Sequence, residues 1–319
     1  MDVVKQPPIR LTEIDWNTSV LSSPSPLWAL VDGVNWPEIQ AVLAEYLPPH
    51  ACLYTTTDPG TQRTAPWLVR VEAGTPMQSL FELQDPNNHG VIYFHSQRGL
   101  KQLRDHFRRY TLLMTPANPD MPVYFRFYDP RVLLDMMSAL DEYKLAQFFV
   151  GLERFFIPKS YPIGLPTYTD VLPLPLDQTT QVTDACLAIE LNQPDAQLIQ
   201  ATQGFKVNDQ EFQQFNQLMA QRRPLNLALK LYRLYADHFT AAHYEYASQL
   251  SYQTGAHFSL KSEREQLLLA DCYLWLGRDF LSHKPEAKSL LLAKHPNRFF
   301  HLQTWLNEQK QRIATSALS

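Results

Sequence analysis

A cluster of prolines divides the chain into two segments with different hydrophobic patterns. Five of the 24 prolines lie close together near the middle of the sequence: Pro158, Pro162, Pro166, Pro173 and Pro175. Because proline removes a backbone hydrogen-bond donor and interrupts regular elements, such a stretch is typical of a domain boundary. We therefore predict a first domain over residues 27–160, a Pro-rich linker over 161–182 and a second lobe over 183–311.

Strand-like and helix-like segments alternate in the first domain. The strand-like segments are apolar, β-branched or aromatic: residues 28–32, 51–55, 66–71, 91–95, 112–114 and 123–127. Helix-like segments lie between them: residues 35–46, 76–83, 98–110, the residues after Pro130, and 141–149. This alternation predicts an α/β domain with a mixed β-sheet.

The second lobe has a helical pattern only, which predicts an all-α lobe. The expected helices cover residues 183–192, 194–203, 208–221, 224–252, 262–276, 285–293 and 296–311. Ser262 and Glu265 form a capping-box pattern that marks the start of one of them. The polar residues 1–26 end in a Ser/Pro run and are expected to form an extended arm, and residues 312–319 a tail.

Several classes of protein are disfavoured by the composition. The ten glycines are scattered singly, so the chain contains neither GxGxxG nor GxxxxGKS for cradling phosphates. The net charge of −4 gives no general attraction to nucleic acid or to an anionic membrane, and no apolar run approaches the roughly 18 residues of a spanning helix. The three cysteines are far apart, which fits neither a disulfide framework nor a metal site. We expect a cytoplasmic protein without cofactor or metal.

The sequence offers no convincing catalytic group. His238 and His243 are five residues apart, about 140° around a helix, so they do not share a metal-binding face. His50 and Cys52 would lie on one side of a strand, but their neighbours are those of an ordinary buried strand. We therefore expect no catalysis, with a small-molecule enzyme using Cys52, His50 and Asp32 as one alternative.

The helix expected over residues 98–110 is strongly amphipathic. Its apolar residues fall on one side, and its basic residues, including Lys101, Arg104 and Arg108, spread over the other. The basic side is either solvated or a docking surface for an acidic partner. A nucleic-acid-binding regulator that uses this helix together with the helical lobe is the second alternative.

The segment Phe125–Leu133 combines a strand end with a helix start. Asp129 is suited to cap the helix, and Pro130 is suited to its first turn. Arg126 lies between two phenylalanines and needs a carboxylate or an aromatic ring beside it, for which Asp32 is a possible partner.

The first domain resembles a family of domain-of-unknown-function proteins that serve as type VI secretion adaptor chaperones, called Tap or TEC proteins. The resemblance covers residues 27–157 and depends on a few motifs: Trp28–Gly33, Ala51–Tyr54, Ala65–Arg70, Leu103–Arg109 and, most distinctively, Phe125–Leu133. The chain departs from the family at Phe148–Leu152, where a Gly-Pro more often follows the paired phenylalanines.

The resemblance implies a cytoplasmic adaptor that binds a type VI effector and helps load it onto the VgrG spike, with no catalytic residues. The motif positions are expected to shape the domain: Asp32, Trp67, Asp129 and Pro130. The expected partner contacts are Lys101, Arg104, Arg108, Arg126, Tyr128 and Arg131. The helical lobe is expected to help select the effector.

Overall fold

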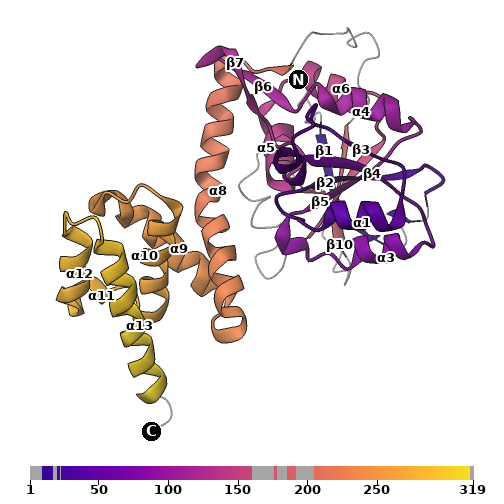
Figure 1. Ribbon diagram of the computed structural model, residues 1–319. Helices are drawn as coiled ribbons and strands as arrows, with labels where there is room; N and C mark the ends of the chain where they lie inside the picture. Colours follow the sequence, from indigo (N-terminus) through magenta and orange to yellow (C-terminus); the bar gives the residue numbers. More distant parts are fainter. Residues whose placement is uncertain are drawn as a thin grey trace. The chain divides into compact units, whose positions relative to one another are not determined.

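The computed structural model describes residues 9–16, 20–21, 23–159, 176–177, 185–191 and 205–316 of the 319-residue chain (Figure 1). The chain forms two compact units, residues 1–220 and 221–319. Each unit is described below by itself. The first is α/β and the second is all-α, as the sequence predicts.

Unit 1 is built on an eight-stranded sheet in the order β3-β4-β2-β5-β8-β10-β1-β9. Neighbouring strands are antiparallel except for β1 and β9, which are parallel, so the sheet is mixed. The strands are β1 (Ile9–Asp15), β2 (Leu27–Asp32), β3 (His50–Cys52), β4 (Pro66–Val71), β5 (Val91–His95), β8 (Arg154–Pro158), β9 (Leu176–Asp177) and β10 (Ala185–Leu191).

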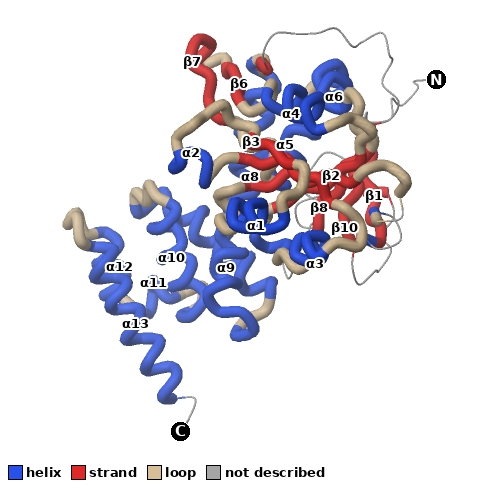
Figure 2. Tube along the Cα trace, turned by 45° about the vertical axis from the view of Figure 1, so that its right-hand side comes forward, coloured by secondary structure: helices blue, strands red, loops and turns tan. Residues whose placement is uncertain are grey.

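Helices cover both faces of this sheet (Figure 2). Alternate residues of β2 point to opposite faces, and all six are buried. On one face α1 (Ile39–Tyr46) and α3 (Pro76–Glu82) pack on Ala29 and Val31. On the other, α4 (Leu100–Arg108) and α6 (Glu142–Phe149) contribute Phe107 and Phe148 to an aromatic cluster with Phe94 and Phe155. Two further helices of the unit are α2 (Pro59–Arg63) and α5 (Pro130–Ala139).

A second, three-stranded sheet has the order β11-β6-β7. It contains β6 (Leu112–Thr115), β7 (Asn118–Tyr124) and β11 (Phe205–Lys206). The long helix α8 (Asp209–Tyr235) follows β11, and its Phe215 ring contacts Phe125 at 5.7 Å between centroids. Within the small sheet, the Phe205 ring of β11 lies 5.2 Å from the Tyr110 ring and 5.6 Å from the Phe125 ring, so aromatic packing joins this sheet to the rest of unit 1.

Two elements of the large sheet differ from the sequence prediction. Residues 9–15 lie in the predicted arm and residues 185–191 in a predicted helix, yet β1 and β10 pair over seven residues, from Ile9 with Leu191 to Asp15 with Ala185. The run from Ala185 to Leu191 is short and apolar, and such a run suits a buried strand as well as a helix. The predicted helix 194–203 and most of the predicted linker 161–182 lie outside the described residues.

Unit 2 contains the end of α8 and five further helices: α9 (Ala241–Gly255), α10 (Glu263–Leu276), α11 (Phe280–His283), α12 (Pro285–Leu292) and α13 (Arg298–Ser316). The capping box at Ser262 is confirmed, because the Glu265 N–H donates to Ser262 Oγ at 3.3 Å and the Ser262 N–H donates to Glu265 Oε2 at 2.8 Å. The predicted break at Pro224 is wrong: α8 continues through it and ends at Tyr235. The helix α13 extends into the predicted tail.

Candidate protein-binding surface

Asp32 and Arg126 meet at the end of β2. The Asp32 side chain is fully buried, and Arg126 Nη2 donates to its Oδ2 atom. The Val34 N–H donates to Asp32 Oδ1 at 2.9 Å, so the carboxylate also fixes the turn after β2. In that turn a Cβ on Gly33 would lie 2.6 Å from the carbonyl oxygens of Arg63 and Ala65, so the position requires glycine. The ion pair suggested by the sequence is present and holds two motif segments together.

Asp129 caps α5, as predicted. Its Oδ1 atom accepts the Arg131 N–H at 3.0 Å, and Pro130 occupies the first turn. The Arg131 guanidinium donates two hydrogen bonds to the same carboxylate, from Nε to Oδ1 at 2.9 Å and from Nη2 to Oδ2 at 2.6 Å. Burial alone would raise the pKa of Asp129, but the Arg131 guanidinium outweighs it and holds that pKa below its usual range. Arg131, predicted as a partner contact, is therefore engaged within the domain.

Tyr128 is an interior residue whose hydroxyl bonds to a surface tyrosine. Its side chain is buried, and its hydroxyl lies 2.6 Å from that of Tyr54. Burial raises the pKa of Tyr128, which therefore remains a neutral phenol. The Tyr54 ring lies 4.7 Å from the ring of Tyr124, which is 64% exposed. Tyr128, predicted as a partner contact, is therefore buried. The aromatic side chains nearer the surface are Tyr54, which is half-buried, and Tyr124, which is exposed.

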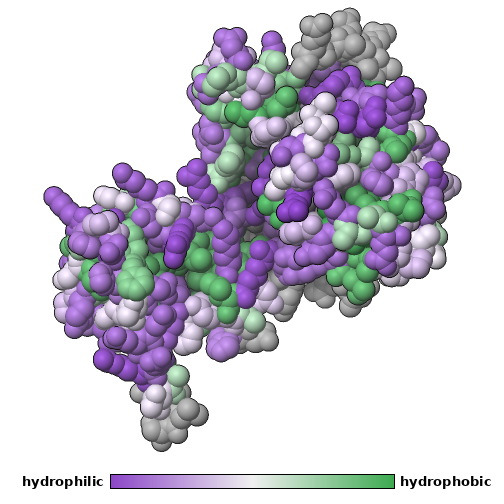
Figure 3. Space-filling view, viewed as in Figure 1, coloured by the Kyte–Doolittle hydropathy of each residue, from purple (hydrophilic) through white to green (hydrophobic). Residues whose placement is uncertain are grey.

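The small sheet exposes apolar side chains on both of its faces, Leu112 with its partner Tyr124 on one and Met121 with Val123 on the other, and we call these four the β6–β7 patch. All seven residues of β7 are exposed, although three of these four side chains are apolar or aromatic residues of that strand. Figure 3 shows hydrophobic atoms among hydrophilic ones over this end of unit 1. This patch was not predicted from the sequence, where its signal is two short segments with apolar residues on either side of Pro116 and Asn118.

The amphipathic helix α4 is confirmed, and its basic side chains have different surroundings. Leu103 and Phe107 are buried against the core, and Lys101 is exposed. Arg104 pairs with Asp105 at 2.8 Å, whereas Arg108 Nη2 donates to the Cys52 carbonyl at 3.1 Å. Two of the three predicted basic contacts therefore already have partners within unit 1.

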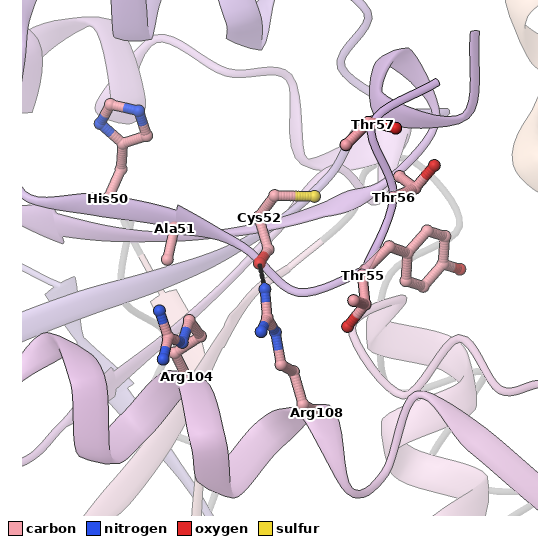
Figure 4. A pocket seen from close by; sticks show the side chains of 9 residues that line it. His50, Ala51, Cys52, Thr55, Thr56, Thr57, Arg104 and Arg108 are labelled. Carbon is pink, nitrogen blue, oxygen red and sulfur yellow. Dashed lines mark hydrogen bonds between the residues drawn. The ribbon is translucent and has the colours of Figure 1, made fainter. Parts of the chain in front are cut away.

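Arg104 and Arg108 line a cavity of about 550 Å³ beside β3. The cavity is also lined by His50, Ala51, Cys52, Tyr54, Thr55, Thr56 and Thr57. In Figure 4 both arginines extend from α4 towards β3, while the His50 and Cys52 side chains point to the opposite side of the strand. We call this space the β3-edge cavity.

His50 and Cys52 share a side of β3 but do not form an activated pair. The His50 Nδ1 atom is engaged by the Pro48 carbonyl at 2.8 Å, and its ring lies 5.8 Å from that of Trp67 on β4. Burial raises the pKa of Cys52, which disfavours the nucleophilic thiolate. Trp67 packs half-buried against the core, consistent with its predicted structural role.

The described residues contain no cluster of three or more His, Cys, Asp and Glu side chains able to hold a metal. His238 and His243 use their Nδ1 atoms locally, with the Tyr235 carbonyl at 2.7 Å and the Thr240 hydroxyl at 2.8 Å. Among the described helices, none is long and apolar enough to cross a membrane.

Residues 27–147, about two fifths of the chain, match the model of a protein family described as Domain of unknown function (DUF4123). The matched region runs from β2 into α6 and includes Asp32, Arg126 and Asp129. It ends just before Phe148–Leu152, where the sequence departs from the expected pattern. No curated protein and no solved structure matches the chain.

Proposed function

We propose that this protein is a cytoplasmic adaptor chaperone that binds a type VI secretion effector and promotes its loading onto the VgrG spike, without catalysis. The observation that carries the proposal is the DUF4123 match over residues 27–147, since that family is associated with type VI effectors. The charged motif residues inside the matched region, Asp32, Arg126, Asp129 and Arg131, bond to one another within the domain. We therefore place effector binding on other surface residues of unit 1.

The β6–β7 patch supports a binding role for unit 1. Exposed apolar side chains commonly mark an interaction site, and aromatic residues contribute strongly to binding energy; this strand pair exposes them on both faces. Met121 is 70% exposed and Tyr124 is 64% exposed. Burial of these side chains against the effector would supply apolar contact area, and the nearby arginines of α4 would contribute to orientation.

Affinity capture from a cell that expresses the type VI system tests the proposal. We expect the tagged full-length protein to retain one effector and VgrG, identified by mass spectrometry, and deletion of its gene to abolish secretion of that effector. Met121→Ser combined with Tyr124→Ser should reduce effector recovery about tenfold, a loss of about 1.4 kcal/mol. Leu83→Ser removes a 78% exposed leucine elsewhere in unit 1 and is the matched control.

Three results would contradict this function. The first is unchanged effector secretion without the protein. The second is salt-sensitive DNA binding that charge reversal at Lys101, Arg104 and Arg108 removes, which favours a nucleic-acid-binding regulator. The third is loss of function in Cys52→Ala while folding and effector capture persist, which favours an enzyme.

A further inference from the structure

The outer edge of β3 presents backbone hydrogen-bonding groups to the β3-edge cavity, and one of them, the Cys52 carbonyl, already accepts from Arg108 Nη2. Among the described strands, β3 is terminal in the large sheet and pairs with β4 alone. The Arg70 N–H donates to the Pro49 carbonyl and the Leu53 N–H donates to the Pro66 carbonyl, both at 2.9 Å. Because bonding alternates along an antiparallel pair, the N–H and C=O groups of His50 and Cys52 point away from β4. The open edge can accept a further strand.

The same cavity carries positive charge. Arg104 and Arg108 are four residues apart on α4, so their side chains lie on one side of the helix, and both line the cavity. The nine lining residues include no carboxylate. Arg108 Nε is buried and has no hydrogen-bond partner among the described residues. A carboxylate placed here would satisfy the buried Arg108 donor, and it would compete with Asp105 for Arg104, whose pair with Asp105 is on the same helix.

We propose that the β3-edge cavity binds an acidic segment of another protein in extended conformation. The segment adds to β3 as the next strand and places a carboxylate between Arg104 and Arg108. Backbone hydrogen bonds to His50 supply affinity, and the arginines select an acidic residue, as in other cases of strand addition. Under the proposed function the segment belongs to the effector, and in that respect the inference rests on the proposed function.

Cys52 provides a native reporter of occupancy. It is half-buried and lines the cavity, with its side chain on the side of β3 opposite the arginines, whereas Cys186 and Cys272 are buried in the cores of their units. A strand added along this edge would place a residue directly beside Cys52 and so cover its thiol. Alkylation of the full-length protein by iodoacetamide should therefore occur at Cys52, with Cys52→Ser giving the background rate. A blocked nine-residue peptide of alternating Thr and Val with a central Asp serves as the probe. Its matched control has Asn in place of Asp.

We expect the Asp peptide to slow alkylation of Cys52 at a concentration at least tenfold lower than the Asn peptide, acetate or inorganic phosphate. Arg104→Gln should remove this preference, and so should Arg108→Gln. Lys101→Gln, on the same helix but outside the cavity lining, should retain it. Arg104→Gln is the more informative variant because Arg104 bonds to Asp105 on its own helix, whereas Arg108 also supports β3.

Several outcomes overturn the proposal. If the Asp and Asn peptides protect Cys52 from alkylation equally well, the carboxylate plays no role. If phosphate or acetate protects Cys52 as well as the Asp peptide does, the cavity is a small-anion site. If a single-stranded oligonucleotide protects Cys52 better than the Asp peptide does, the cavity binds nucleic acid. If nothing protects Cys52, the cavity does not bind an acidic extended segment. The peptide assay needs no secretion system: effector capture without peptide protection refutes this inference alone, and peptide protection without effector capture refutes the proposed function alone.

Discussion

At the scale of single residues, His106 shows how its partners determine its protonation state. The ring is buried, its Nε2 atom lies 2.8 Å from the Phe148 carbonyl, and its Nδ1 atom lies 2.9 Å from Arg109 Nη2. A carbonyl only accepts and a guanidinium only donates, so Nε2 carries the proton and Nδ1 is the acceptor. Burial, together with the nearby Arg109 and Arg98, lowers the pKa of His106 to about 4. The neutral ring is therefore the form that the fold requires.

This arrangement predicts a pH dependence of stability. Because the folded-state pKa lies below the unfolded value of about 6.5, the unfolded chain binds the proton first as pH falls. The stabilisation is complete above pH 6.5 and is lost between about pH 6.5 and 4. When the pH falls from 7.5 to 5.0, we expect the proton uptake of His106 in the unfolded chain to lower the free energy of unfolding by about 2 kcal/mol. His106→Gln should show a drop smaller by that amount in urea titrations; an identical drop in both proteins would contradict it.

The buried carboxylate of Asp32 predicts a second effect. Asp32→Asn keeps an acceptor for the Val34 N–H but removes the charge that faces Arg126. We expect a loss of about 2–3 kcal/mol in the free energy of unfolding, measured in urea at pH 7.5. The matched control is Arg70→Gln, which breaks the exposed Arg70–Glu72 pair and should cost about 0.5 kcal/mol or less. Equal losses in the two variants would show that the Asp32 pair is energetically ordinary.

The sequence alone predicts the roles of some of the motif residues and not of others. Arg126 between two phenylalanines requires a nearby counter-charge, and a carboxylate at the end of a buried strand satisfies that requirement, so their pairing could be predicted. The cap at Asp129 is local and could be predicted for the same reason. Tyr128 could not be placed, because whether a tyrosine lies inside or outside depends on which distant side chain, here Tyr54, covers its hydroxyl.

At the scale of elements, β7 is an exposed strand that lies at an edge of the small sheet among the described strands, and one of its prolines faces outward. The Phe125 N–H donates to the Thr111 carbonyl at 2.9 Å, so Val123 bonds towards β6 and Pro122 and Tyr124 face outward. Pro122 has no N–H to offer there. Proline at an edge is one of the ways in which proteins prevent strands of different molecules from pairing.

Restoring the missing donor should therefore promote self-association. We expect Pro122→Thr to form dimers and larger species at protein concentrations where the wild type does not, measured by sedimentation velocity. Met121→Thr, which removes an exposed apolar side chain without adding an edge donor, should not do so. Unchanged sedimentation of Pro122→Thr would show that this edge is protected by something other than proline.

The type of an element could be predicted where its local pattern is long, as in α4 and α10. The prediction failed where the strand that pairs with the element is remote in the sequence. The strands β1 and β10 are defined by their pairing with one another across some 170 residues. Neither segment carries a strand signal strong enough by itself, and burial between β8 and β1 decides the conformation of β10. The β3-edge cavity was missed because it depends on strand order.

At the scale of the whole molecule, the sheet order determines where the chain can be cut. A protein ending near residue 165, within the predicted linker, lacks β10, which lies between β8 and β1. We expect such a fragment to aggregate or to bind the dye ANS as a loosely packed state. A fragment of residues 1–235 retains every described strand and the whole of α8, and should keep the near-UV circular dichroism of folded unit 1. A stable, dye-free 1–165 fragment would refute this.

The position of β10 between β8 and β1 also has a consequence for synthesis. The two neighbours of β1 in this sheet, β9 and β10, both come after β8 in the sequence, and β10 is complete only 33 residues after β8 ends. At roughly 5–20 residues per second, the outer edge of β8 stays open for a few seconds in each nascent chain. Although β1 precedes the other described strands of its sheet in the sequence, it therefore pairs only after the chain between β8 and the end of β10 has been made.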